Sequence, residues 1–516
     1  MTRTFKPAAA FVLAGVSLTG ALFAESSTTL PKRPEEIKFD TLRFEPPNAA
    51  DYRHKLSSGV TVYMIQSKEF PLISVNLSFK GGAYLEPADK VGLASMTGAM
   101  MRRGGTVTIK AQDMDEQFDF LAARASAFCG STTSGASINS LASNFDQSFA
   151  LFMDMVRNPG FQEDKVKIYR DEQLEAMKQR NDDANTIMAR ESRALVWGRD
   201  HFEARVPTKA TLDAITIDDM KAFHHRIFNP GNMIVGVVGD FDEKQMLNKL
   251  ETAFSGWAAT GETIPDPADT DFKPTPGLFH VEKDIPQGKI AIGKRALKRD
   301  DPDQIKVEVM NEILGGGGFT ARLMKRIRSD EGLTYGVGSG FGNRVYYPGT
   351  FSVTTFSKNR TVALTTRMVF EEINKMINEA ATEQELDTAK NALIETFPRT
   401  FENKNAVVGV FIDDQWTKRD PNYWKTYRDN VRKVTLADVQ EMAKKYCNPD
   451  QLGVLVVGKW SEICNGDPTE QRETHKASMD DIKGGKVTHL PLRDPLTMEP
   501  MPEQTKTDAA PAGASH

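Results

Sequence analysis

Few side chains in this chain have both the type and the spacing that catalysis needs. His224 and His225 lie in a segment with helical character and have no further ligand at metal-binding spacing, so we interpret them as ordinary helix residues. Ser95 has no evident neighbouring base, which favours a small helix residue over a nucleophile. An independent hydrolase therefore has no supporting group of residues in the sequence.

Arg328 and Tyr335 are the better candidates for chemistry. They lie seven residues apart and follow the run Gly-Gly-Gly-Gly-Phe-Thr-Ala-Arg-Leu over residues 315–323. Both side chains donate hydrogen bonds, the arginine as a charged fork and the tyrosine as a neutral hydroxyl. Donors aimed at a developing negative charge in an enclosed site accelerate reactions by orders of magnitude. By spacing alone, an arginine at a helix end and a tyrosine at a strand start are usually a surface residue and a core residue.

The four consecutive glycines have two interpretations. Gly316, Gly317 and Gly318 could let the backbone approach a substrate, or they could form a packing turn. A phosphate-binding loop is excluded, because no Gly-Lys-Ser/Thr follows.

A segment in the first half resembles a known active-site helix. Gly-Gly-Ala-Tyr-Leu-Glu-Pro at residues 81–87 and Gly-Leu-Ala-Ser-Met-Thr-Gly-Ala-Met at 92–100 are similar to the active-site entry of the insulinase/pitrilysin zinc metallopeptidases. That family continues Gly-Leu-Ala with His-x-x-Glu-His, in which the histidines bind zinc and the glutamate activates water. The resemblance places Ser95 and Ala99 at the histidine positions, Gly98 at the glutamate and Ala176 at the third ligand. It therefore implies that this chain binds no metal.

The same resemblance gives Arg328 and Tyr335 a role. In the family this pair, seven residues apart, contacts the substrate carbonyl and its oxyanion, and some bacterial members are heterodimers that divide the zinc motif and the pair between two subunits. The sequence resembles the subunit without zinc, so we expect Arg328 and Tyr335 to act in trans in a homologous partner that carries the zinc. The substrate would be an unfolded or extended peptide. The alternative is a catalytically inactive scaffold or peptide-binding homologue in which the pair is idle.

The elements that position these residues form a repeat. Thr-x-x-Asp, Asn-Pro and Val-Val-Gly recur from residues 216–239 to residues 435–458 at a constant offset of 219. Each copy starts a helix with a capping pattern, stops it at Asn-Pro and enters a β-branched strand. The helices and strands do not alternate regularly, which predicts an α+β fold. We expect two homologous domains, each a largely antiparallel sheet with helices packed on one face.

The expected domain organisation follows from composition. Arg3 and Lys6 precede an apolar, small-residue run that is typical of a secretory signal peptide, so we expect export, with the periplasm as the destination. No later stretch is long and apolar enough to span a bilayer, and a net charge of -5 argues against a nucleic-acid surface. The expected segments are a signal peptide (1–24), an N-terminal extension (25–49), the first domain (50–259), a Pro-rich linker (260–277), the second domain (278–464) and a polar tail (465–516).

The three cysteines, Cys129, Cys447 and Cys464, cannot all pair within one chain. Cys447 and Cys464 could form a bridge in an exported protein, but their spacing does not require one. We favour three unpaired thiols.

Overall fold

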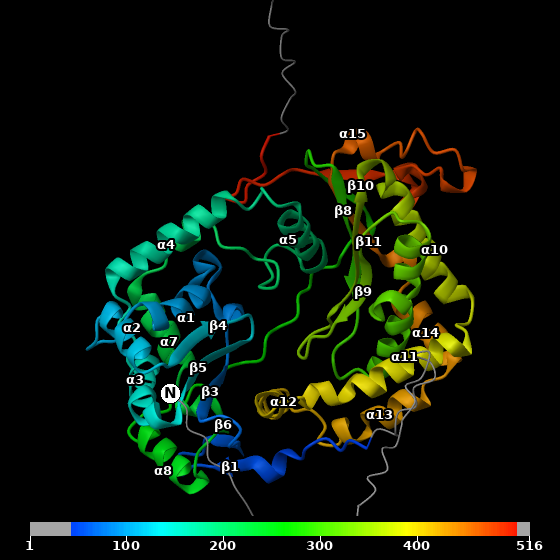
Figure 1. Ribbon diagram of the computed structural model, residues 1–516. Helices are drawn as coiled ribbons and strands as arrows, with labels where there is room; N and C mark the ends of the chain where they lie inside the picture. Colours follow the sequence, from blue (N-terminus) through cyan, green and yellow to red (C-terminus); the bar gives the residue numbers. More distant parts are fainter. Residues whose placement is uncertain (1–42, 503–516) are drawn as a thin grey trace, which may run out of the picture. The chain divides into compact units, whose positions relative to one another are not determined.

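The computed structural model of the protein describes residues 43–502 (Figure 1). The predicted signal peptide (1–24) and most of the predicted N-terminal extension lie outside the described residues, as does the end of the predicted tail. Strands of the first half are β1 (Arg53–Lys55), β2 (Thr61–Gln66), β3 (Leu72–Lys80), β4 (Arg124–Cys129), β5 (Thr133–Leu141) and β6 (Met233–Gly239). Its helices are α1 (Leu93–Arg103), α2 (Ala111–Phe120), α3 (Phe145–Arg157), α4 (Glu163–Lys178), α5 (Ala184–Trp197), α6 (Lys209–Asp213), α7 (Ile217–Ile227) and α8 (Glu243–Phe254).

The second half has a similar order of elements. Its strands are β7 (Gly277–Glu282), β8 (Gln287–Arg295), β9 (Val337–Gly342), β10 (Thr350–Lys358), β11 (Gly453–Gly458) and β12 (Val487–Leu490). Its α-helices are α9 (Gln304–Asn311), α10 (Val362–Asn378), α11 (Glu383–Thr396), α12 (Lys404–Thr417), α13 (Tyr423–Lys433), α14 (Leu436–Tyr446) and α15 (Trp460–Ile463). One π-helical turn, Glu312–Gly316, includes the first two glycines of the run, and a second, Met324–Asp330, follows the run.

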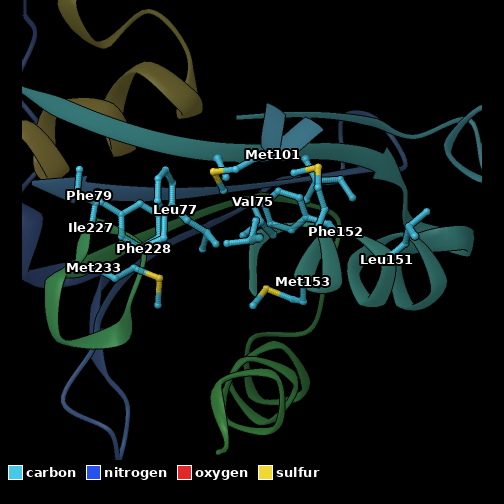
Figure 2. Packing of buried hydrophobic residues seen from close by; sticks show 14 of the residues in the cluster. Val75, Leu77, Phe79, Met101, Leu151, Phe152, Met153, Ile227, Phe228 and Met233 are labelled. Carbon is cyan, nitrogen blue, oxygen red and sulfur yellow. The ribbon is translucent and has the colours of Figure 1, made fainter. Parts of the chain in front are cut away.

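The first sheet has the strand order β1-β2-β6-β3-β5-β4 and is antiparallel except where β2 pairs with β6. Side chains along β3 alternate between buried and half-buried, as a strand with one core face requires. Leu77 and Phe79 point from this strand into the core, where the rings of Phe79 and Phe228 lie 4.8 Å apart (Figure 2).

The second sheet repeats the pattern in the order β12-β7-β11-β8-β10-β9. Its β11 runs parallel to β7 and antiparallel to β8, just as β6 runs parallel to β2 and antiparallel to β3. The prediction of an α+β fold with two homologous, largely antiparallel domains is confirmed.

The helix starts that revealed the repeat have the predicted geometry. Thr216 Oγ1 accepts the amide of Asp219, whose carboxylate accepts the amide of Thr216; Thr435 and Asp438 form the same reciprocal pair. Each box satisfies backbone donors at the first turn of α7 or α14, which stabilises the helix start.

One helix from each half packs against the sheet of the other half. The repeat in the sequence did not predict this exchange. Helix α12 packs on β2 and β6, while α5 packs on β8 and β11 (Figure 1). On β6, Val235 and Val237 face the first core, so Gly236 faces the opposite side, where α12 lies. A Cβ at Gly236 would lie 2.5 Å from Val408 Cγ1, so glycine allows this close approach.

The predicted polar tail over 465–516 is wrong for part of its length, because β12 pairs in parallel with β7 and forms one edge of the second sheet. The segment then reaches the first half, where Leu496 packs against the core and accepts a hydrogen bond from the amide of Lys209 at 2.8 Å. A strand of four residues with polar neighbours gives little apolar pattern, which explains why composition suggested a tail.

The predicted linker has no helix or strand between residues 260 and 276, and β7 begins at Gly277. Cys129, Cys447 and Cys464 are free thiols. Within residues 43–502, no helix has the length and apolar character to cross a membrane.

Candidate functional site

Helix α1 carries the positions that the family resemblance assigns to a zinc motif, and its start is fixed by a buried carboxylate. Gly92 precedes the helix in the left-handed region at φ 108°. Glu86, which is buried, accepts the amide hydrogen of Ala94 at 2.7 Å. Burial raises the pKa of Glu86, and the backbone donors partly oppose this rise. The carboxylate of Glu86 therefore accepts a backbone hydrogen bond at the N-terminus of α1.

The motif positions on α1 hold no ligand. Ser95 is exposed, Ala99 is half-buried and Gly98 is buried against β4. A Cβ at Gly98 would lie 2.7 Å from the carbonyl carbon and 2.8 Å from the Cα of Phe128, and closer still to the amide nitrogen of Cys129. The position that the resemblance assigns to the catalytic glutamate therefore lacks room for any side chain unless β4 moves.

Helix α4 faces α1 with groups that do not suit a metal ion. Tyr169 OH lies 3.4 Å from Ser95 Oγ, and Arg103 of α1 forms two hydrogen bonds of 2.9 Å with Glu172. Hydrogen bonding from the Arg103 guanidinium lowers the pKa of Glu172. Ala176, the predicted third-ligand position, is exposed and has no donor atom in its side chain. Its neighbour Glu175 pairs with Lys178 along the same helix at 2.6 Å.

The residues around α1 and α4 do not fit zinc. Imidazoles and carboxylates with free lone pairs would be needed, and a hydroxyl pair with a guanidinium–carboxylate pair stands there instead. Across residues 43–502, no three His, Cys, Asp or Glu side chains gather in a way that could hold a metal ion.

The structure brings Arg328 and Tyr335 together. Arg328 belongs to the π-helical turn Met324–Asp330, and Tyr335 lies two residues before β9. The Arg328 Cζ atom lies 4.4 Å from the centroid of the Tyr335 ring, which is 77% exposed. In the described part of the chain, Arg328 has no carboxylate partner. Its charge is therefore available to a ligand.

The turn between the two residues is held at both ends. Glu331 accepts hydrogen bonds from Arg326 at 2.5 Å and from His475 at 2.7 Å. Burial raises the pKa of Glu331, but these partners outweigh it, so the pKa is lowered overall. Before β9, the hydroxyl of buried Thr334 donates to the carbonyl of Gly336 and accepts its amide hydrogen, which fixes the backbone on both sides of Tyr335.

Close packing explains why three of the four glycines in the run cannot carry a side chain. A Cβ at Gly315 would lie 2.5 Å from Ser339 Oγ, and one at Gly317 would lie 2.6 Å from the carbonyl oxygen of Glu312. Gly316 is similarly confined, with Asn311 Nδ2 at 2.6 Å from such a Cβ. Gly318 differs: it has open space and a φ of 60°, a conformation that favours glycine.

Gly318 presents a residue that the sequence analysis did not single out. Phe319 is 66% exposed, and its ring centroid lies 4.6 Å from Arg328 Cζ. The position of Phe319 directly after four glycines was the sequence feature that could have indicated an exposed ring. Nothing in the sequence pointed to His475, because it lies in the segment predicted as a tail.

Comparison with known proteins identifies the family. Residues 214–393 match the family described as "Peptidase M16 inactive domain". The non-peptidase homolog YmxG of Helicobacter pylori is 23% identical over 404 residues, which cover 77% of this chain and 91% of that protein. The chain belongs to the M16 peptidase family. The resemblance to insulinase/pitrilysin peptidases is thereby confirmed.

Other relatives match this chain over a similar length. An uncharacterized zinc protease of Rickettsia felis is 23% identical over 343 residues, covering 66% of this chain and 81% of that protein. The crystal structure of a peptidase M16 inactive domain from Pseudomonas fluorescens superposes with a TM-score of 0.69 at 24% identity, covering 79% of this chain and 97% of that one. This likeness shows that the two chains share the M16 fold.

Proposed function

We propose that this chain is the subunit without zinc of an exported heterodimeric metallopeptidase, located in the periplasm. A homologous partner would carry the zinc motif, and Arg328 and Tyr335 would act in that partner's active site. One observation carries the proposal: Arg328 and Tyr335 lie together, the tyrosine exposed and the arginine half-buried, while α1 and α4 hold no metal-ligand set.

The chemistry of the pair suits substrate polarisation. Arg328 and Tyr335 would donate hydrogen bonds to the carbonyl oxygen of the bond to be cleaved and to the oxyanion that it becomes. Removing one such donor in an enclosed site typically reduces turnover by about 100- to 1,000-fold. The absence of an acidic partner among the described residues supports this role, because a carboxylate on Arg328 would compete with the substrate.

The sheet edge beside the pair supports an extended peptide as substrate. Strand β9 is the outermost strand of its sheet and starts two residues after Tyr335. Its sequence, Val-Gly-Ser-Gly-Phe-Gly, has neither the charged residues nor the proline that usually protect an edge strand. Asn311 already donates to the carbonyl of Ser339, so an added strand would pair with the backbone on either side of that residue. Gly316 ends the first π-helical turn, and Gly317 and Gly318 follow it directly before Phe319; all three remain candidate substrate contacts.

The test is reconstitution with the partner. Copurification from the native host identifies the partner, and cleavage of a quenched peptide is then measured for each chain and for the mixture. Cleavage is expected only in the mixture. Arg328→Ala and Tyr335→Phe are expected to lower turnover while size-exclusion chromatography still shows the pair. Lys325→Ala is the matched control, since it removes an exposed positive charge from the same π-helical turn.

A second function is favoured by the name of one relative. YmxG is described as a non-peptidase homolog, so this chain could be a scaffold or peptide-binding protein without a part in proteolysis. Unchanged turnover with both Arg328→Ala and Tyr335→Phe in an assembled pair would leave that function as the better account.

A further inference from the structure

Phe319 lies at the Arg328–Tyr335 pair without belonging to the motif that identified it. Phe319 is 66% exposed, although a phenylalanine side chain gains stability when it is buried. In the second half of the described chain, from Gly277 onward, the large apolar side chains that remain exposed are Phe319 and Tyr335. Both lie against the same guanidinium.

The geometry of the three residues is that of a clamp. The Arg328 Cζ atom lies 4.6 Å from the Phe319 ring centroid and 4.4 Å from that of Tyr335. No ring contact joins Phe319 to Tyr335 in the described residues, so each ring contacts the guanidinium separately. A guanidinium stacks on aromatic faces while its five N–H donors point outward in its own plane.

The loop before Phe319 fixes this arrangement. Gly318 adopts a left-handed conformation, and Thr320 Oγ1 donates to the carbonyl of Gly317 at 2.8 Å, which closes a tight turn around the phenylalanine. Arg322, three residues on, forms two hydrogen bonds with Glu385 of α11 at 2.6 and 2.8 Å. The segment that carries the Phe319 ring is therefore fixed by hydrogen bonds on its C-terminal side.

We propose that Phe319 is a positioning residue for Arg328: with Tyr335 it holds the guanidinium plane, so that the N–H donors face the substrate carbonyl. This inference rests on the proposed function, in which Arg328 contacts substrate. Phe319 would act through stacking, so another aromatic ring should replace it and an aliphatic side chain of similar size should not.

The first measurement needs only the isolated chain. In protein labelled with nitrogen-15 arginine, the Nε–Hε signal of Arg328, assigned by its loss in Arg328→Lys, is expected to be shifted upfield by ring currents. Phe319→Leu should move it toward the position of an unstacked arginine, and Phe319→Trp should keep it shifted. Phe120→Leu is the control, because Phe120 is 87% exposed elsewhere. An unshifted signal in the wild-type chain, or no movement in Phe319→Leu, would overturn the clamp.

The second measurement uses the reconstituted pair. Phe319→Leu is expected to lower kcat about two- to fivefold with little change in KM, the effect of losing one exposed cation–π contact, while Phe319→Trp keeps the wild-type rate. If Arg328→Ala lowers turnover but Phe319→Leu does not, the positioning role is wrong and the proposed function stands. If Arg328→Ala itself has no effect, both fail.

Discussion

Replacing Gly98 by alanine separates two physical effects with opposite signs. Gly98 lies inside α1, where alanine is intrinsically favoured over glycine by about 1 kcal/mol. By helix propensity alone, Gly98→Ala should stabilise the protein. Packing predicts the reverse, because the new methyl would meet the backbone of Phe128 and Cys129 in β4.

The magnitude follows from what the methyl would contact. It would lie 2.7 and 2.8 Å from two backbone atoms of Phe128, and no flexible side chain is among its nearest neighbours to move aside. Overpacking a well-filled core costs about 1–3 kcal/mol, and a contact with strand backbone belongs to the upper end. After subtracting the helix gain, we expect a net loss of about 2 kcal/mol. For one folded unit of the size of residues 45–516, this lowers Tm by roughly 2 °C.

The assay is unfolding by urea and by heat, followed by circular dichroism. Ser95→Ala is the matched control: it lies on the same helix but is exposed, so it should change stability by less than about 0.5 kcal/mol. A Gly98→Ala midpoint at or above that of the wild type would refute the packing argument. Gly98→Glu brings the same clash, so rebuilding the zinc motif on α1 should destabilise the first half.

Two further predictions concern packing and pH. Gly236→Val should destabilise the protein by about 1–3 kcal/mol in urea unfolding, because a Cβ there would lie 2.5 Å from Val408 of α12; an unchanged midpoint would show that α12 does not press on β6. Hydrogen bonding from Arg322 lowers the pKa of Glu385 to about 2, against an ordinary value of about 4.3. The stability from this pair is therefore present above about pH 4.3 and lost as pH falls toward 2. Glu385→Gln should flatten the acid limb of the stability profile over that window, and an identical limb would contradict the assignment.

The repeat was predictable because its signals are local. A Thr-x-x-Asp box needs only four neighbouring residues, and the boxes at Thr216 and Thr435 formed as expected. The buried strands β6 and β11 were equally visible, since β-branched runs after Asn-Pro have few alternatives.

The exchange of helices between the two halves could not be predicted, because the apolar face of an amphipathic helix does not indicate which sheet it packs against. The apolar residues of α5 and α12 fit either sheet, and Gly236 on β6 looked like any strand glycine until Val408 was placed against it. Strand β12 was missed because four residues beside an edge contribute little apolar pattern.

The candidate site was predictable in part. The resemblance to a family motif singled out Arg328 and Tyr335, whose role in catalysis stays a prediction, and the absence of metal-ligating residue types on α1 was visible in the sequence. The contact of Phe319 with Arg328 depends on the left-handed turn at Gly318, and the bond from His475 to Glu331 joins residues 144 apart in the chain. Such contacts leave no periodic signal in a single sequence.

Native mass spectrometry after equilibration with zinc tests the central claim most directly. The isolated chain is expected to retain no zinc, while the assembled pair carries one ion that belongs to the partner. One tightly held zinc ion on the isolated chain would contradict the account, since it would require a ligand set that α1 and α4 do not offer.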